Sequence, residues 1–131
     1  MDLILWRHAQ AVDAHESLDD LKRPLTVQGE GQAAEMAGWL KRHLPKNTRI
    51  VCSPALRTRQ TALRLTKDNY HIVPQLAPGA SVAALLQAAD WPHSEHAVLV
   101  VGHQPTLGLA AQQLLGMHMP CAIKKGAVWW L

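Results

Sequence analysis

The sequence AVLVVGHQPT at residues 97–106 predicts a buried strand that leads through a tight turn into a helix. Its first five residues are all apolar, which is typical of a strand covered on both faces. Gly102 and His103 end the strand, and Pro105 can open a helix over residues 106–115. This strand, turn and helix predict an α/β protein with a mostly parallel sheet.

Similar patterns recur on both sides of this segment. Apolar runs predict further strands at residues 2–6, 49–52 and 71–74, and an edge strand at 127–131. Helical spacing predicts helices over 33–44, 55–65 and 82–89. Thr26 and Ser81 are suitable N-caps for the first and third of these, and Pro54 can open the second. The alternation predicts a sheet with helices on both faces.

The composition favours one soluble domain over residues 1–131. The chain is 48% hydrophobic, which suits a single core, and its glycines and prolines form no linker or repeat. Cys52 and Cys121 lack the spacing of a metal site, so we expect a reducing, cytoplasmic compartment. No apolar stretch approaches the roughly 18 residues of a membrane span. The dispersed charges, net +3, leave nucleic-acid binding a minor option, and we expect a monomer without nucleic-acid or membrane partners.

Three segments place polar side chains at the expected ends of strands: Arg7-His8, residues 53–57 and Gly102-His103. Such ends meet at one edge of a parallel sheet, so these segments can converge on one site. Guanidinium groups match the geometry and charge of phosphoryl oxygens. An imidazole nitrogen could then attack phosphorus, with His8 the better placed nucleophile and a protonated His103 neutralising charge.

Four motifs, in this order, resemble a known family: R-H-A at 7–9, R-P-L-T at 23–26, S-P-A-L-R-T-R-Q-T-A at 53–62 and V-G-H-Q-P at 101–105. The chain resembles the histidine phosphatase superfamily and, within it, the short SixA-type phosphohistidine phosphatase branch. The resemblance covers nearly the whole chain. It implies a three-layer αβα sandwich with a mostly parallel central sheet, a minimal phosphoglycerate-mutase-like fold without a cap insertion.

The resemblance also implies roles for four residues. His8 matches the nucleophile that becomes phosphorylated, and His103 matches the second histidine of the active site. Arg7 and Arg57 match the arginines that bind phosphate. The implied enzyme is a phosphatase that uses no metal and no cofactor. Its implied substrate is a phosphorylated protein, a signalling or phosphotransfer domain that carries a phosphohistidine.

Three further positions follow the family pattern less closely. Arg23 resembles an auxiliary substrate-binding residue near the pocket mouth. Ser53 lies where the family turns its backbone toward the phosphate. Ala9 stands where much of the superfamily has glycine, a change that is familiar in the short branch.

The stretch Ala77-Pro78-Gly79-Ala80 lacks the carboxylate that many superfamily members use in this region as general acid. An alkoxide leaving group needs a proton, whereas imidazole, with a pKa near 6.5, leaves as a neutral molecule once its ring is protonated. The missing acid therefore favours cleavage of a P–N bond. We predict a protein phosphohistidine phosphatase with a covalent phospho-His8 intermediate and an open pocket mouth.

Two other functions stay open. One is a small-molecule phosphomonoesterase of the same superfamily, which would need an acid from elsewhere, such as Asp13 or Glu16. The other is a catalytically silent phosphate-binding regulatory module. A metal site at H-S-E-H, residues 93–96, is disfavoured because its two histidines lack helical support and a third ligand, so we expect a surface loop there.

The remaining conspicuous residues have structural interpretations. Arg59 and Arg64 follow Arg57 on the same predicted helix and are expected to be solvated or ion-paired. Trp6 and Trp39 fall on apolar faces and are expected in the core. Trp129-Trp130 lie in the final apolar segment, where adjacent rings of an edge strand point to opposite faces.

Overall fold

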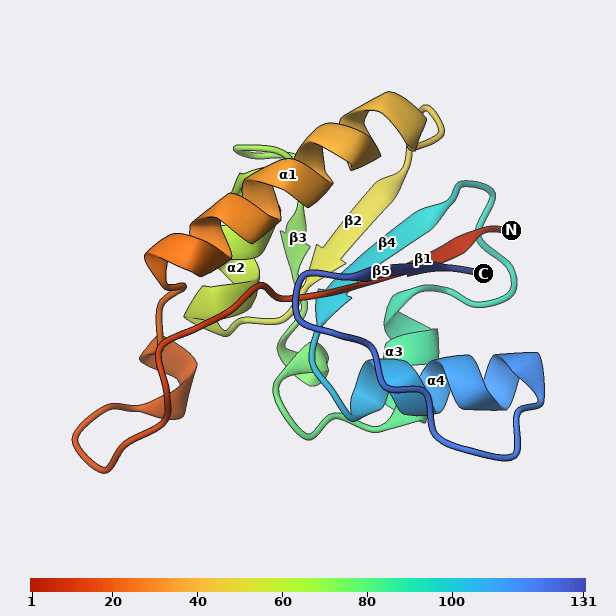
Figure 1. The fold of residues 1–131 in the computed structure, drawn as a ribbon. Coiled ribbons are helices and arrows are strands. Elements are labelled where there is room, and N and C mark those ends of the chain that lie inside the picture. Colours follow the sequence, from red (N-terminus) through yellow and green to blue (C-terminus); the bar gives the residue numbers. More distant parts are fainter.

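The computed structural model describes residues 1–131 and contains one five-stranded sheet with the order β3-β2-β4-β1-β5 (Figure 1). Strands β1 to β4 are parallel to their neighbours, and β5 runs antiparallel to β1 at the edge. The bounds are Leu3–Arg7 for β1, Arg49–Cys52 for β2, His71–Ile72 for β3, Val98–Gly102 for β4 and Val128–Trp130 for β5. The predicted, mostly parallel sheet is confirmed.

Two helices cover each face of this sheet. Helices α1 and α2 pack on one face, and α3 and α4 pack on the other (Figure 1). The bounds are Val27–His43 for α1, Leu56–Leu63 for α2, Val82–Ala88 for α3 and Thr106–Leu115 for α4, with short 3-10 helices η1 at Asp20–Lys22 and η2 at Pro74–Leu76. The fold is therefore the expected three-layer αβα sandwich.

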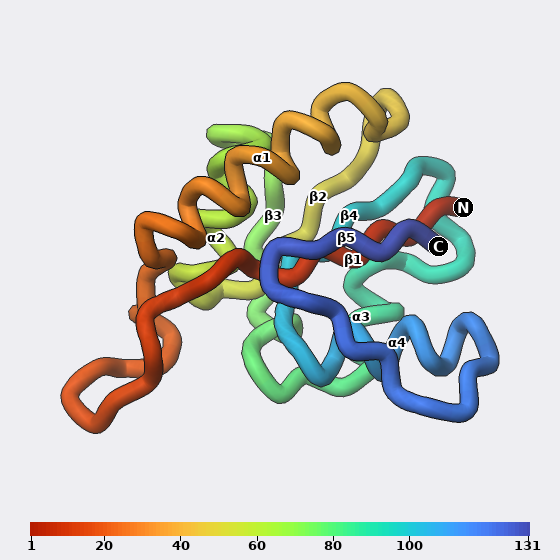
Figure 2. The backbone as a smooth tube through the Cα atoms, viewed as in Figure 1, coloured from red at the N-terminus to blue at the C-terminus, as the bar shows by residue number.

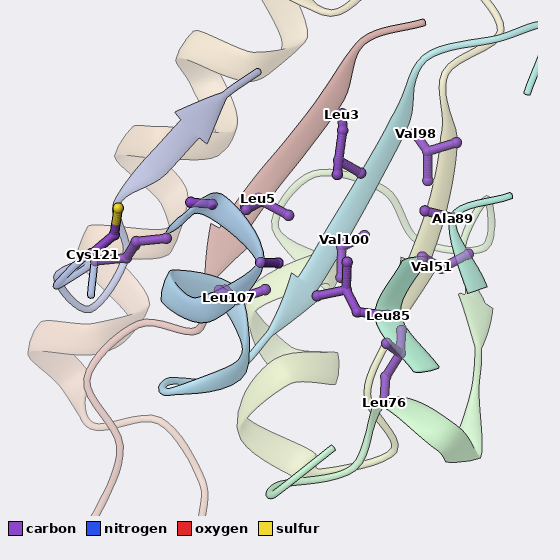
Figure 3. Close-up of a cluster of buried hydrophobic side chains, with 13 residues drawn as sticks. Leu3, Leu5, Val51, Leu76, Leu85, Ala89, Val98, Val100, Leu107 and Cys121 are labelled. Atoms are coloured by element: carbon purple, nitrogen blue, oxygen red, sulfur yellow. The ribbon is translucent and has the colours of Figure 1, made fainter. Parts of the chain in front are cut away.

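The uniformly apolar strands fill two cores with alternate side chains. Leu3 and Leu5 of β1 join the core under α3 and α4, together with residues such as Leu107 (Figure 3). Ile4 and Trp6 point to the opposite face and join the core under α1 and α2. Because successive side chains of a strand point to opposite faces, a strand covered twice must be apolar at every position.

Local signals position most helix ends. The side chain of Thr26 accepts a hydrogen bond from the backbone N–H of Gly29 at 3.0 Å, and Ser81 caps α3 in the same way through Ala84. Helix α2 begins at Leu56 with Ala55 as its N-cap, so Pro54 lies one residue further from the helix than expected. The strand predicted at 71–74 is shorter, because Pro74 begins η2.

The tryptophans are placed partly as expected. Trp6 is fully buried, and Trp129 and Trp130 lie on opposite faces of β5. The prediction for Trp39 was wrong: its ring is 38% exposed and stacks on His43 at a centroid distance of 4.1 Å. Trp39 lines a surface hollow with Met36 and Trp130 instead of packing in the core.

Two surface features complete the chain. Arg64 is ion-paired with Glu30 at 2.6 Å, as expected, and residues 93–96 lie in the loop before β4. The loop over residues 12–24 projects from the sandwich and is closed at its base by a bridge between Ala11 and Leu25 (Figure 2). None of the helices is both long and apolar enough to cross a membrane.

Candidate active site

The three polar strand ends converge on one cavity of about 280 Å³. The strand register explains why two of these ends meet, because Arg7 at the end of β1 pairs with Gly102 at the end of β4. The N–H of His8 then donates to the Gly102 carbonyl at 3.1 Å. Helix α2 contributes Arg57 from its first turn. The lining residues are Arg7, His8, Ala11, Arg23, Arg57, Pro78, His103, Gln104 and Lys125.

The ring of His8 is held in one tautomer. Its Nδ1 lies 2.7 Å from the carbonyl oxygen of Ala9, which can only accept, so Nδ1 carries the hydrogen. The N–H of Ala9 in turn donates to the hydroxyl of Thr61 at 3.1 Å, which fixes the turn. The neutral ring therefore keeps a free lone pair on Nε2, the nitrogen that could act as a nucleophile.

Burial keeps the His8 ring neutral. The side chain is only 6% exposed, and this desolvation, assisted by the charges of Arg57 and Arg7, lowers the pKa of His8 to about 4. The hydrogen bond to Ala9 opposes the shift but does not cancel it. At neutral pH the ring is unprotonated at Nε2, as nucleophilic attack requires.

His103 faces His8 with ring centroids 5.4 Å apart. Its Nε2 lies 2.7 Å from the hydroxyl oxygen of Ser53, which also accepts from the N–H of Ala55. The Ser53 hydroxyl can donate its hydrogen to Nε2, and this arrangement places the ring hydrogen on Nδ1. That Nδ1 is buried and has no protein partner.

The sequence predicts a protonated His103, but the phosphate-free site favours the neutral ring. Burial lowers the pKa of His103 to about 3, and the positive charge of Arg57 acts in the same direction. The ring is thus neutral before a phosphoryl group arrives. An incoming dianion would oppose this shift and raise the pKa, because an adjacent opposite charge stabilises the protonated ring.

The two arginines are oriented by acceptors outside the cavity. Nη1 of Arg7 donates to the carbonyl of Ile123 at 2.9 Å. Nη1 and Nη2 of Arg57 donate to the backbone and carboxylate oxygens of Asp20 at 2.8 and 3.2 Å. In both side chains Nε is buried without a partner. Burial lowers the pKa of both guanidinium groups, and both stay charged at neutral pH.

Arg23 and Ser53 have different places in the site. Arg23 lines the cavity, as the sequence predicted for a residue near its mouth, and is held by the Val12 carbonyl at 2.7 Å and by Asp20 at 3.0 Å. Ser53 was expected among the substrate-binding residues but does not line the cavity. It is fully buried behind His103, so its hydroxyl positions that ring instead.

Sequence reasoning missed Asp20, Gln104 and Lys125. Asp20 lies three residues before Arg23 in the segment D-D-L-K-R, a spacing that was the available signal for an ion pair. Gln104 lies within the V-G-H-Q-P motif, and its amide is held by Cys121 and Gly108. Lys125 reaches the cavity from the loop before β5, and nothing local in the sequence indicates that loop's position.

The cavity contains cations but no carboxylate. None of its nine lining residues is Asp or Glu, and Pro78 occupies the region where the family's acid was missing from the sequence. Asp13 and Glu16 are exposed in the projecting loop and do not line it. No three His, Cys, Asp or Glu side chains gather into a metal-binding group. The arrangement can hold a tetrahedral oxyanion next to a neutral imidazole.

A larger hollow of about 590 Å³ lies between α1 and β5. Met36, Trp39 and Trp130 contribute much of its apolar wall, and Lys125 borders both hollows. Its lining contains no histidine or arginine, whereas the smaller cavity contains both. We therefore place the candidate active site in the smaller, polar cavity.

Comparison with known proteins agrees with this geometry. The profile of the histidine phosphatase superfamily (branch 1) matches residues 3–78. An uncharacterised protein of Picosynechococcus sp. is 38% identical over an alignment of 120 positions, which covers 87% of this chain and 73% of that protein. The phosphohistidine phosphatase SixA of Escherichia coli is 29% identical over an alignment of 136 positions, which covers 98% of this chain and 83% of that enzyme.

Solved structures show the same fold. The protein histidine phosphatase SixA complexed with tungstate superposes with a TM-score of 0.80 at 28% identity, over 99% of this chain and 86% of that chain. A phosphoserine phosphatase from Entamoeba histolytica has a TM-score of 0.73 at 18% identity, over 98% of this chain and 89% of that chain, and shows the likeness of fold alone. From the matching profile and these relatives, the chain belongs to the histidine phosphatase superfamily, in its SixA-type branch.

Proposed function

We propose that this protein is a phosphohistidine phosphatase that removes phosphate from a phosphorylated signalling or phosphotransfer protein of the cytoplasm. The observation that carries the proposal is the free Nε2 of a neutral His8 in a cavity with unpartnered donors. The residues that carry them line the cavity, and the nitrogens left without a protein partner are Nε of Arg7, Nε of Arg57 and Nδ1 of His103. Three donors suit the three terminal oxygens of a phosphoryl group.

In the first step, the Nε2 lone pair of His8 attacks phosphorus as the P–N bond of the substrate breaks. The leaving imidazole nitrogen takes the electron pair of that bond, and its ring departs neutral because its other nitrogen is protonated. His8 is left as a cationic phosphoimidazole whose Nδ1–H is held by the Ala9 carbonyl. The arginines and His103 stabilise charge on the transferring oxygens.

In the second step, water attacks the phosphorus of phospho-His8. The new P–O bond forms as the P–N bond to Nε2 breaks, the water gives up a proton, and orthophosphate leaves. The neutral ring of His8 is thereby restored. This two-step route replaces one difficult displacement with two easier ones.

The lining of the cavity supports a P–N substrate over a phosphate ester. An ester requires a proton donor for its leaving alkoxide, and no carboxylate lines the cavity to supply one. A protonated phosphohistidine carries its own proton. A protein side chain could also reach the site, because the chain has no cap insertion over its strand ends.

Matched substrates test this proposal. We expect the wild-type protein to hydrolyse phosphoramidate much faster than an alkyl phosphate, and rapid quench at alkaline pH should trap an acid-labile phosphoenzyme. His8→Ala should abolish both turnover and trapping, while circular dichroism and the unfolding midpoint stay close to wild type. His43→Ala, which changes an exposed histidine on α1, is the control and should retain full activity.

A preference for the alkyl ester would contradict the proposal and favour the phosphomonoesterase alternative. Substantial turnover by His8→Ala would remove His8 as the nucleophile. Phosphate binding without any phosphoenzyme would indicate the silent regulatory module.

A further inference from the structure

The projecting loop over residues 12–24 contributes Asp20, which contacts Arg57 of α2 and Arg23 of the loop itself. Asp20 begins η1 and presents three acceptor oxygens to two guanidinium groups. The side chain of Asp20 is 50% exposed, and Asp20 does not line the cavity. Asp20 therefore lies behind the arginines, where it does not meet a bound phosphoryl group.

The contact of Asp20 with Arg57 uses one edge of the guanidinium group. Nη1 donates to the Asp20 carbonyl at 2.8 Å and Nη2 donates to its Oδ2 at 3.2 Å. These bonds engage the end of the guanidinium fork and leave Nε, which is buried and unpartnered. Arg57 thus keeps a side-on pair of donors, Nε and the second hydrogen of Nη2, for an oxyanion.

The contact of Asp20 with Arg23 offsets the repulsion between Arg23 and Arg57. Arg23 and Arg57 line the same cavity, and their like charges repel when no anion is present. Oδ1 of Asp20 accepts from Nε of Arg23 at 3.0 Å, while Oδ2 accepts from Arg57. One carboxylate therefore bridges both cations and holds them ready in the phosphate-free protein.

The carboxylate is in the charged form that this bridge requires. Partial burial raises the pKa of Asp20, but the hydrogen bond from Arg23 and the charge of Arg57 outweigh it, and the net pKa lies below the usual value. Asp20 is therefore an anion at neutral pH, without a proton to donate.

We propose that Asp20 is a positioning residue for phosphoryl transfer, which fixes the donor edge that Arg57 presents to the phosphate. This inference rests on the proposed function, since it concerns the same transfer step. It also couples the projecting loop to the active site: whatever moves η1 also moves Arg57. Asp20 acts through the arginines and makes no contact with the reacting atoms.

Asp20→Asn tests the proposal, with Asp13→Asn as a matched control. Both remove one negative charge from the same loop, but Asp13 is exposed and has no hydrogen bond or ion pair to the site. An amide offers one oxygen, so its NH2 group would face one of the two guanidinium groups donor to donor. We expect phosphoenzyme formation from phosphoramidate in a single turnover to slow about tenfold or more in Asp20→Asn.

The dissociation constant of tungstate, a tetrahedral oxyanion, should change less than about threefold in Asp20→Asn. Removing the Asp20 charge makes the site more positive, which favours the oxyanion, whereas losing the bridge leaves the arginines less well oriented, which disfavours it. Asp13→Asn should match wild type in both measurements. Equal losses in the two variants would show that only loop charge matters. A parallel loss of rate and tungstate affinity would show a ground-state binding role, and either result overturns the proposal.

Nitrogen-15 NMR separates this proposal from the proposed function, because it needs no turnover. We expect the Nε–H signal of Arg57 to be resolved in the wild-type protein, to shift on addition of tungstate, and to be broadened or lost in Asp20→Asn. An unchanged Arg57 signal in that variant overturns the positioning role even if phosphoramidate turnover fails altogether.

Discussion

The hydroxyl group of Ser53 shows how one buried atom can orient a catalytic ring without meeting the substrate. It accepts from the N–H of Ala55 and lies 2.7 Å from Nε2 of His103. A histidine tautomer is set by the partner of its other nitrogen. When the Ser53 hydroxyl donates to Nε2, the hydrogen of His103 lies on Nδ1, which has no protein partner. His8 uses the same principle with the carbonyl of Ala9.

Ser53→Ala should remove this control. We expect the turnover rate to fall about tenfold, and the free energy of unfolding to fall by about 1–3 kcal/mol because Nε2 of His103 loses its buried partner. Imidazole nitrogen NMR should show a mixture of His103 tautomers. Ser94→Ala, in the exposed loop before β4, is the control, and normal activity with a single His103 tautomer in Ser53→Ala would contradict the assignment.

At the scale of elements, the close approach of α1 to the turn after His8 shapes the site. Gly29 is buried in the first turn of α1, and a methyl group there would overlap the carbonyl oxygen of Gln10. That same oxygen accepts from the N–H of Thr26 at 3.0 Å. The helix N-terminus and the catalytic turn are therefore packed backbone to backbone, which only glycine permits.

Two glycine substitutions in α1 should have opposite effects. Gly29→Ala should destabilise the protein by about 1–3 kcal/mol, because the Gln10 backbone must move, and should slow phosphoenzyme formation by displacing Ala9. Gly31→Ala meets no atom within 4 Å and should stabilise the helix by about 0.5–1 kcal/mol. Urea unfolding gives both values. Similar stabilities in the two variants would be inconsistent with this packing.

At the scale of the whole molecule, the buried histidines link stability to pH. The pKa values of His8 and His103 fall to about 4 and about 3 in the folded protein. An unfolded histidine titrates near 6.5, so below that pH the unfolded chain takes up protons that the folded site refuses. The stability contributed by these two neutral rings is complete above pH 6.5 and is lost as the pH falls toward 4 and 3.

We expect the free energy of unfolding to decrease between pH 6.5 and pH 4.5, with a slope of up to about 1.4 kcal/mol per pH unit for each histidine. Urea unfolding at pH 7, 6 and 5 measures it. The double variant His8→Asn/His103→Gln should show a flatter dependence in this window. If the free energy of unfolding of the double variant has the same pH slope as that of wild type, other titratable groups cause the loss of stability.

Most of the architecture follows from local patterns. The apolar runs identify the strands, Thr26 and Ser81 identify the starts of α1 and α3, and helix α4 has the predicted bounds. These features depend on neighbours within a few residues, which a sequence displays directly. The parallel sheet then brings its strand ends to one edge, so the meeting of Arg7, His8, Arg57 and His103 is predictable as well.

The sequence by itself determined the fold class and the four residues that meet in the cavity. The tertiary structure alone decided how they are held: Asp20 contacts Arg57 across 37 positions, Ser53 contacts His103 across 50, and Ile123 contacts Arg7 across 116. The neutral state of His103 and the exposure of Trp39 were also decided by the tertiary structure alone. The physical reason is that desolvation and hydrogen-bond partners depend on atoms that are close in space but far along the chain, whereas periodicity and capping are local.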